Sequence, residues 1–456
     1  MFFLNSTMAK IKTLCYSIHL VSFIAFLYSC TVIADELGIK PNGGEVKLNF
    51  SGADSNELIE VMSLEEAIKM GLEKSNKYLA SQEKLSADNY LKSASYSNFL
   101  PALDMRIAHG LQKYESTDGQ IRRSDAYMSL TQPLFDLGAM AELKKSSAKR
   151  EQSLYQMIAT KDDIAYQISN AFYQLIEASL VVDINNSQMN RLEKLGGIIE
   201  SRASVGGAAK SDSERIKARI LTSRSNWQSS VETLRQASLK FFQLTGFKPK
   251  RLIYTDKDLN YVLPPFKHVL ASMHENNPDL ISSKKSEDYA KEEVNSQKSK
   301  LFPKVRLELS TNNFSQEGNG WKRDDRAMLV LDMSLFSGFG DYNRINSALA
   351  SQNQARYERL DLENEYRSSL EIAFGAISSA ENKISTLHDQ LKTQQDVVLS
   401  LEKQQEINGG KILDLFDSYQ EYYNSQQELV RTKIQKALLQ KQVLLISGLI
   451  NQNVNN

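Results

Sequence analysis

The sequence predicts an α+β membrane protein in which one structural unit occurs twice. The unit consists of a helix, a β-hairpin, a long helix and a shorter returning helix. Three observations indicate this fold: an internal repeat with an offset of roughly 200 residues, paired stretches of alternating apolar and polar residues, and two very long helical runs that lack proline. The unit is far longer than a solenoid repeat, so we interpret it as a duplicated domain.

The repeat is visible in short segments that recur in the same order. We divide the chain into a first repeat over 63–262, a second repeat over 263–450 and a short tail at 451–456. The matching pairs are Asn98-Phe99-Leu100-Pro101 with Lys300-Leu301-Phe302-Pro303, Leu134-Phe135 with Leu335-Phe336, and Gly206-Gly207 with Gly409-Gly410, at offsets of 202, 201 and 203 residues.

The composition excludes several functional classes. Lys plus Arg equals Asp plus Glu at 55 each, so the bulk charge does not indicate a nucleic-acid partner. With 21 Gly and 8 Pro, the chain favours long helices over a compact mixed fold. The histidines are scattered and form no catalytic arrangement with Asp, Glu or Ser. We therefore expect neither an enzyme nor a cofactor or metal site.

The N-terminus has the pattern of a targeting segment. Lysines precede an apolar run over 14–27, and a small-residue cleavage site ends at Ala34, so we expect residues 1–34 to be a signal peptide. Both cysteines, Cys15 and Cys30, lie inside this segment, which leaves the mature chain without disulfides or thiolate metal sites. In a competing interpretation, the residues before Cys30 form a degraded lipoprotein box, and Cys30 carries a lipid.

The first repeat is preceded by a segment without period and begins with a helix. Residues 35–62 are rich in Gly, Asp and Asn and predict a loose leader. Ser63 and Glu66 form the pattern of a capping box, from which a helix runs to about Phe99. This helix has to end before Pro101, because proline disfavours the helical conformation of the residue before it.

Each repeat then contains two stretches of alternating apolar and polar residues. We expect strands at about 102–112 and 125–135 in the first repeat and at about 304–312 and 326–336 in the second, with polar loops between them. Two isolated soluble hairpins would have little core to face. A transmembrane barrel requires this alternation, and each stretch is close to the roughly 9–11 residues that cross a bilayer.

A long helical run follows each hairpin and then reverses. The runs cover about 136–202 and 337–406, so each helix is on the order of 100 Å long at about 1.5 Å per residue. Glycine accepts the left-handed backbone of a tight reversal, so we place the tips of the two helical hairpins near 203–208 and 407–411. The tip glycines are Gly206, Gly207, Gly409 and Gly410.

Four transmembrane strands are too few to close a barrel. An open sheet in lipid would leave the hydrogen-bonding groups of its edges unpaired, at several kcal/mol each. If the strands cross the membrane, the protein must therefore oligomerise, and a trimer would supply twelve strands.

Several short segments, in their order and duplication, resemble the TolC-like outer membrane efflux protein family. The first repeat supplies Ser63–Ile68 with Ser75-Asn76, Phe99–Pro101 and Leu130–Asp136, and the second supplies Glu275–Leu280, Leu301–Pro303 and Leu335–Gly338. The resemblance covers nearly all of the mature chain. It implies a homotrimer with one shared twelve-stranded β-barrel in the outer membrane, continued by an α-helical barrel in the periplasm.

The resemblance also implies a function and partners. Members of this family are exit ducts of drug or metal efflux pumps and of type I secretion systems. Their lipid surroundings are those of the outer membrane. They dock through the helical tips on a periplasmic adaptor (a membrane fusion protein), which joins them to an inner-membrane RND or ABC transporter. The transported substrate is chosen by that transporter and cannot be read from this chain.

The resemblance places a gate just beyond the second tip. Asp414 and Asp417 are three residues apart and share one face of a helix. By resemblance they line the periplasmic constriction, where rings of carboxylates in a trimer select cations. Asp212 is the equivalent of Asp414 in the first repeat. The alternatives are solvated surface aspartates for the pair and a helix N-terminal residue for Asp212.

The sequence departs from the family pattern at the tip. The tyrosine and arginine that close the family's gate would fall at Gln405 and Gly410, with Lys411 one residue late. The residues that hold the tip closed should therefore differ in this chain. Aromatic residues suited to a membrane interface lie at the expected strand ends, namely Tyr114, Tyr127, Phe302, Trp321 and Phe336.

Two other functions remain open at this level. A periplasmic coiled-coil scaffold or adaptor would have soluble hairpins and would be recovered from the periplasm. A pump-independent porin would conduct strongly without closure by the gate aspartates.

Overall fold

The computed structural model describes residues 44–48, 58–113, 120–205, 209–255, 259–316, 320–408 and 412–450. The expected signal peptide with Cys30, the tail, and the residues Gly206, Gly207, Gly409 and Gly410 lie outside these ranges. Among the described residues, none of the helices combines the length and the hydropathy that a membrane-spanning helix needs.

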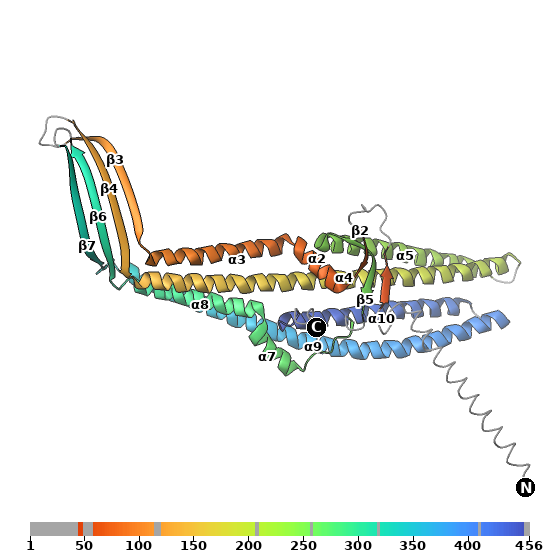
Figure 1. Ribbon diagram of the computed structural model, residues 1–456. Helices are drawn as coiled ribbons and strands as arrows, with labels where there is room; N and C mark the ends of the chain where they lie inside the picture. The colour runs from red at the N-terminus through yellow and green to blue at the C-terminus, as the bar shows by residue number, and fades with distance from the viewer. Residues whose placement is uncertain are drawn as a thin grey trace, which may run out of the picture. The chain divides into compact units, whose positions relative to one another are not determined.

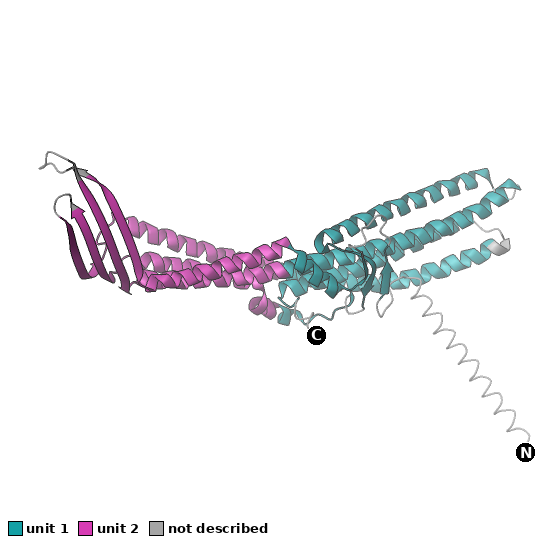
Figure 2. Ribbon diagram, turned by 45° about the horizontal axis from the view of Figure 1, so that its top comes forward, with its two compact units in different colours: residues 1–75, 162–269, 369–456 teal, residues 76–161, 270–368 magenta. Residues whose placement is uncertain are grey.

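The chain forms two compact units (Figure 2). Unit 1 is drawn from 1–75, 162–269 and 369–456, and unit 2 from 76–161 and 270–368. The two long helices, α4 (Leu137–Ser204) and α9 (Gly340–Asn408), contribute residues to both units.

Unit 2 contains a four-stranded antiparallel sheet in the order β3-β4-β6-β7 (Figure 1). The strands are β3 (Ala102–Lys113), β4 (Gln120–Phe135), β6 (Lys304–Gln316) and β7 (Trp321–Asp332). The pairing of β4 with β6 joins the hairpin of the first repeat to that of the second. Strand β7 is displaced toward the loop relative to the expected 326–336, so Leu335 and Phe336 follow the strand instead of ending it.

The register separates the side chains of this sheet into two unlike faces. Leu103, Leu130 and Leu309 lie opposite one another across three strands, and the neighbouring row consists of Asp104, Ser129 and Ser310. The apolar face carries Leu103, Met105, Ile107, Met128, Leu130, Leu307, Leu309, Leu329 and Leu331, and the polar face carries Asp104, Arg106, Arg123, Asp125, Arg306, Glu308, Asp324 and Arg326.

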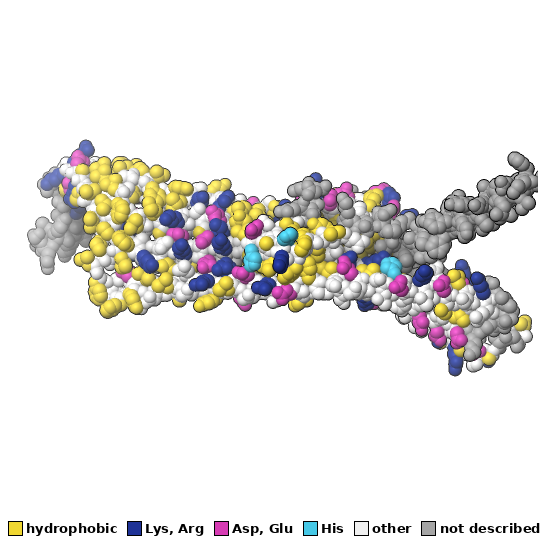
Figure 3. Space-filling model, turned by 90° about the horizontal axis from the view of Figure 1, so that it is seen from below, with side chains coloured by type: hydrophobic (Ala, Val, Ile, Leu, Met, Phe, Trp, Pro, Cys, Tyr) yellow, Lys and Arg dark blue, Asp and Glu magenta, His cyan; other side chains and the backbone are white. Residues whose placement is uncertain are grey.

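The two faces also differ in the contacts and the exposure of their side chains. On the polar face, Arg123 pairs with Asp125 at 2.9 Å and Arg326 pairs with Asp324 at 2.6 Å. On the apolar face, Leu103 remains 64% exposed. Figure 3 shows hydrophobic side chains gathered over the sheet of unit 2. An apolar surface of this extent indicates a partner surface or a lipid environment.

The helices of unit 2 pack through charged and polar contacts. Helix α3 (Asn76–Ser95) and the short helix η2 (Tyr96–Phe99) lead into β3, and α8 (Pro278–Ser299) leads into β6. Lys145 of α4 pairs with Glu293 of α8 at 3.1 Å, and Arg359 of α9 pairs with Glu287 of α8 at 2.8 Å. These contacts hold α8 against α4 and α9.

The first helix is broken, contrary to the uninterrupted helix expected from 63 to 99. Helix α2 (Leu64–Lys74) belongs to unit 1 and ends at Ser75, whose backbone is extended at φ −73° and ψ 106°. The expected capping box is present, because the Glu66 N–H donates to Ser63 Oγ and the Ser63 N–H donates to Glu66 Oε2. The periodicity alone did not indicate the break, because the residues around Ser75 contain neither glycine nor proline.

Unit 1 contains a small mixed sheet that the sequence did not predict. Strand β5 (Lys248–Tyr254) lies between β1 (Gly44–Lys47), which is antiparallel to it, and β2 (Leu58–Met62), which is parallel to it. The expectation of a loose leader over 35–62 is therefore wrong for the residues of β1 and β2. Both strands are too short to show a period, and their partner residues in β5 lie about 190–210 residues further along the chain.

The remaining helices of unit 1 are α5 (Lys210–Thr245), α10 (Ile412–Ile446) and the parts of α4 and α9 that belong to this unit. Helix α7 (Phe266–Asn276) spans the boundary between the units in sequence. Helix α5 ends at Gly246, whose φ of 74° is the left-handed conformation that glycine tolerates at a helix C-terminus. Helix α2 packs closely on α4, because a Cβ on Gly71 would lie 2.4 Å from Ile168 Cδ1.

Candidate functional site

The residues expected at the gate lie at one end of unit 1, where α4 and α9 end and α5 and α10 begin. A buried apolar cluster joins all four helices there. We call it the helix-end cluster, and it consists of Leu192, Ile199, Ile216, Val398, Leu415, Phe416 and Tyr419. Because the cluster contains residues of all four helices, it fixes how the first turns of α5 and α10 are presented.

Asp414 and Asp417 are exposed at the start of α10. Leu415 and Phe416, which lie between them in sequence, are each 1% exposed and belong to the helix-end cluster. The helical period thus turns the apolar side chains inward and both carboxylates outward. Asp417 accepts a hydrogen bond from Arg219 of α5 and forms an ion pair with it. Asp414 lies in the first turn of α10, where the helix dipole favours a negative charge.

Asp212 lies in the first turn of α5 and is partly exposed. Its backbone N–H donates to the Ala209 carbonyl at 3.1 Å. Ile216, one turn further along α5, lies in the same cluster as Leu415 of α10. The structure thus places Asp212 on a helix that packs against the helix of Asp414, and the position also fits a helix N-terminal residue.

The ion pair between Arg219 and Asp417 was not predicted from the sequence. Arg219 is seven residues after Asp212 and therefore lies on the same face of α5. That spacing was the signal in the sequence that could have placed Arg219 beside the proposed gate. It could not identify the partner, because Asp417 is 198 residues away in the chain.

A second polar cluster links three helices beside the helix-end cluster. We call it the triad: Arg191 of α4, Glu402 of α9 and Tyr419 of α10. Arg191 Nε donates to the Tyr419 hydroxyl at 2.7 Å, and both Arg191 and Tyr419 donate to Glu402 Oε1. Burial raises the pKa of the Tyr419 hydroxyl, and its hydrogen bond to Glu402 raises the pKa further. Tyr419 therefore stays neutral and can act as both donor and acceptor.

The triad differs from the arrangement expected at the tip. Gln405 lies in α9, one turn after Glu402, while Gly410 and Lys411 lie outside the described residues. The tyrosine that contacts Glu402 is Tyr419, which the sequence did not single out. Its polar role was not visible locally, because Arg191 is 228 residues away.

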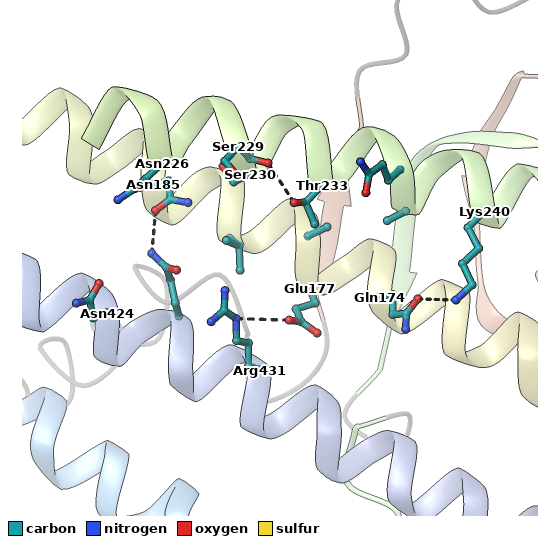
Figure 4. Close-up of a pocket in the computed structure, with 15 residues that line it drawn as sticks. Gln174, Glu177, Asn185, Asn226, Ser229, Ser230, Thr233, Lys240, Asn424 and Arg431 are labelled. Atoms are coloured by element: carbon teal, nitrogen blue, oxygen red, sulfur yellow. Dashed lines mark hydrogen bonds and ion pairs between the residues drawn. The ribbon is translucent and has the colours of Figure 1, made fainter. Parts of the chain in front are cut away.

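A polar cavity of about 610 Å³ lies between α4, α5 and α10 (Figure 4). Its walls carry mainly amide and hydroxyl side chains, among them Asn185 of α4, which accepts from Gln427 of α10 at 2.8 Å. Glu177 of α4 and Arg431 of α10 form an ion pair at 3.7 Å across it. Burial raises the pKa of Glu177, and Arg431 opposes that effect. The lining residues contain no nucleophile paired with a general base.

No metal-binding cluster is present in the described part of the chain. There, no group of three or more His, Cys, Asp or Glu side chains is placed to hold an ion. The arrangement at this end of unit 1 presents charged side chains and holds the four helices together.

Comparison with known proteins agrees with the resemblance. Residues 269–448 match the model of the family described as "Outer membrane efflux protein". The chain is 22% identical over 366 residues to the outer membrane protein TolC of Escherichia coli strain K12, a match that covers 72% of this chain and 70% of TolC. A second TolC, from Salmonella enteritidis, is also 22% identical, over 375 residues.

Solved structures share the fold. A structure of CusC, determined in a study of transmembrane channel formation, matches with a TM-score of 0.75 at 13% identity over 88% of this chain and 96% of CusC. The outer membrane protein VceC of Vibrio cholerae matches with the same TM-score and identity over 84% of this chain and 96% of VceC.

These matches confirm the resemblance on which the sequence analysis relied. The family and its relatives are outer membrane proteins and channels, which agrees with the absence of catalytic arrangements in the sequence. The chain is therefore similar to TolC and, over residues 269–448, to the outer membrane efflux protein family, whose members lie in the outer membrane with a helical part in the periplasm.

Proposed function

We propose that this protein is the outer-membrane exit duct of a tripartite efflux pump or a type I secretion system. It would work as a homotrimer with a twelve-stranded barrel, continued by a periplasmic α-helical barrel. The observation that carries the proposal is the four-stranded sheet of unit 2, which has two open edges and two unlike faces.

The edges of the sheet support a ring of copies. Within the described residues, β3 and β7 each pair with one strand only. The strands alternate in direction across the sheet, so β7 of one copy runs antiparallel to β3 of the next and can pair with it. Such a head-to-tail contact closes into a ring. Three copies of a four-stranded sheet give 3 × 4 = 12 strands, enough for a membrane barrel.

The faces of the sheet support its orientation in such a ring. The apolar face would contact lipid, and the polar face, with its Arg–Asp pairs, would line a wet lumen. Apolar side chains on the helices of unit 2 are also exposed in the single chain, including Tyr90 of α3 and Tyr357 of α9. Burying these side chains against a second copy would add to the stability of the trimer.

The gate is proposed at Asp414, Asp417 and Asp212. In a trimer, each aspartate would form a ring that attracts cations and repels anions. The tip residues Gly206, Gly207, Gly409 and Gly410 would meet a periplasmic adaptor, which connects the duct to an inner-membrane RND or ABC transporter. If the lipoprotein interpretation holds, a lipid on Cys30 would add an anchor to the barrel.

Cell fractionation tests this proposal against a periplasmic scaffold. We expect the protein in outer-membrane extracts as a trimer, detected by native mass spectrometry after extraction in detergent. Recovery of a monomer from the soluble periplasm would overturn the duct and favour the scaffold.

Planar-bilayer recording separates the duct from a pump-independent porin. We expect a low conductance that rises, or that loses its block by multivalent cations, when Asp414 and Asp417 are both replaced by Ala. A high conductance that these substitutions leave unchanged would favour the porin.

A further inference from the structure

The sheet of unit 2 has an end that faces away from its helices. β3 and β6 begin next to helices, β4 ends just before one, and β7 ends shortly before α9. The turns that close the two hairpins are at the opposite end of the strands. Because the helical part lies in the periplasm, the hairpin end is the outer end of the sheet. The role assigned below to this end rests on the proposed function, in which the apolar face contacts lipid.

The character of the apolar face changes toward this outer end. Ile107 and Ala126 form the last row in which two neighbouring strands both carry apolar side chains on this face. Arg323 lies in that row on β7, and further out the same face carries basic, hydroxyl, imidazole and indole groups beside Leu111. We call this set the outer rim, and it consists of His109, Arg122, Ser124, Ser315, Trp321 and Arg323.

The outer-rim side chains are held on the face that carries the apolar residues. His109 Nδ1 and Ser124 Oγ share a hydrogen bond of 2.8 Å across β3 and β4. Arg323 Nε donates to Asp325 Oδ1 at 2.9 Å, yet 68% of the Arg323 side chain stays exposed. Arg122 is exposed as well.

The position of these guanidinium groups restricts what can surround them. An Arg on the lipid face of a barrel costs about 2–4 kcal/mol at the bilayer midplane and about 0–1 kcal/mol near the interface. Trp321, in the row of His109, Ser124 and Ser315, is an interface residue by type and is exposed. The outer rim therefore lies at the level of the lipid headgroups.

The headgroup chemistry that fits this rim is a phosphate. Guanidinium groups bind phosphate oxygens through paired hydrogen bonds, and hydroxyl and imidazole groups add further donors. The outer leaflet of an outer membrane carries lipopolysaccharide, an anionic glycolipid with phosphates on its sugar headgroup. We propose that the outer rim, through Arg122 and Arg323, binds the phosphate groups of lipopolysaccharide.

The chain offers a closely matched control for this proposal. Arg122 and Arg123 are neighbours on β4 and point to opposite faces, and Arg323 and Arg326 are likewise on opposite faces of β7. The double variant Arg122→Gln/Arg323→Gln removes two charges from the apolar face. The double variant Arg123→Gln/Arg326→Gln removes two charges from the polar face and leaves the outer rim intact.

The test measures binding of lipopolysaccharide to the purified full-length protein in detergent, using native and phosphatase-treated glycolipid. We expect the native form to bind about tenfold more tightly than the dephosphorylated form, as the loss of charge-assisted hydrogen bonds implies. This preference should disappear in Arg122→Gln/Arg323→Gln and persist in Arg123→Gln/Arg326→Gln. Equal affinity of the unaltered protein for both glycolipids, or an equal loss in both variants, would overturn the proposal.

A second measurement separates failure of this inference from failure of the proposed orientation. The chain has two tryptophans, so Trp227→Phe leaves Trp321 as the single reporter. Brominated lipid should quench Trp321 fluorescence if the apolar face contacts lipid. Quenching together with phosphate-independent binding would reject the outer rim alone, whereas the absence of quenching would reject the orientation as well.

Discussion

Arg219 and Asp417 meet at the start of α10 with side chains that are 40% and 55% exposed. Ion pairs exposed to this degree contribute at most about 1 kcal/mol to the free energy of unfolding. The pair therefore affects the charge at the proposed gate more than it affects the free energy of unfolding. It compensates one of the two carboxylates of the proposed gate, whereas Asp414 forms no ion pair within the described part of the chain.

This compensation predicts the effect of Arg219→Gln. Removing the guanidinium should deepen block by multivalent cations severalfold, because two carboxylates per chain would then face the constriction. The measurement is single-channel current in planar bilayers with increasing concentrations of a multivalent cation.

The control is Arg224→Gln, which removes another exposed ion pair of α5, with Glu193 of α4. Its block should match that of the unaltered protein. If the cation blocks the current of Arg219→Gln to the same extent as that of the unaltered protein, the assignment of Asp417 to the gate is wrong.

The triad predicts a loss of stability in Tyr419→Phe. Removing the hydroxyl deprives Arg191 and Glu402 of one hydrogen-bond partner each and should cost about 1 kcal/mol. Thermal unfolding in detergent measures this as a lower midpoint. Thr393→Val, which also removes a hydroxyl but at an exposed position of α9 in unit 1, should leave the midpoint unchanged. Equal midpoints for all three proteins would show that the triad does not stabilise the helix ends.

The helices and strands differed in how far they could be predicted from the sequence. Alternating apolar and polar residues in four stretches predicted the hairpins of unit 2. A strand with one apolar and one polar face shows this period of two in its own sequence. The break at Ser75 and the strands β1 and β2 were missed. Both depend on packing against segments remote in sequence, which overrides a weak local pattern.

The contact between α4 and α8 predicts a dependence on pH. Burial alone would raise the pKa of Glu293, but hydrogen bonds from Gln297 and Lys145 outweigh it and hold the pKa below 4.5. A carboxyl whose folded pKa is lowered stabilises the fold above its unfolded pKa. That contribution is lost as pH falls through the folded pKa.

The variant Glu293→Gln should therefore lower the unfolding midpoint at neutral pH, and the difference from the unaltered protein should shrink as the pH falls below 4.5. Thermal unfolding over this pH range measures it. Glu292→Gln, at the neighbouring half-buried position, is the control. A difference that stays constant with pH would exclude ionisation of Glu293 as the cause.

At the scale of the whole molecule, the proposed trimer is the arrangement that would satisfy the open edges of the sheet and cover its apolar face. Neither feature is expected in a protein that works as a soluble monomer. An exposed, long and apolar sheet edge would otherwise invite aggregation. Three copies would remove the edges, and lipid would cover the face.

Met105→Lys tests this arrangement. A lysine on the lipid face near the midplane should cost about 2–4 kcal/mol and reduce the amount of trimer in the outer membrane. The matched control is Asp104→Lys, which places the same side chain one residue earlier on the polar face. Quantitative blotting of outer-membrane fractions compares the two. Equal amounts of trimer would indicate that the apolar face does not contact lipid.

The sequence by itself determined the duplication, the two hairpins with their unlike faces, and the position of Asp414 and Asp417 after the second tip. These features are encoded locally, by period and by spacing. The tertiary structure decided which hairpins pair, through β4 and β6, and which strands join β5. It also decided that Arg219 meets Asp417 and that Tyr419 joins Arg191 to Glu402. Residues about 200 positions apart meet only when distant segments pack together, and no local pattern names the partner.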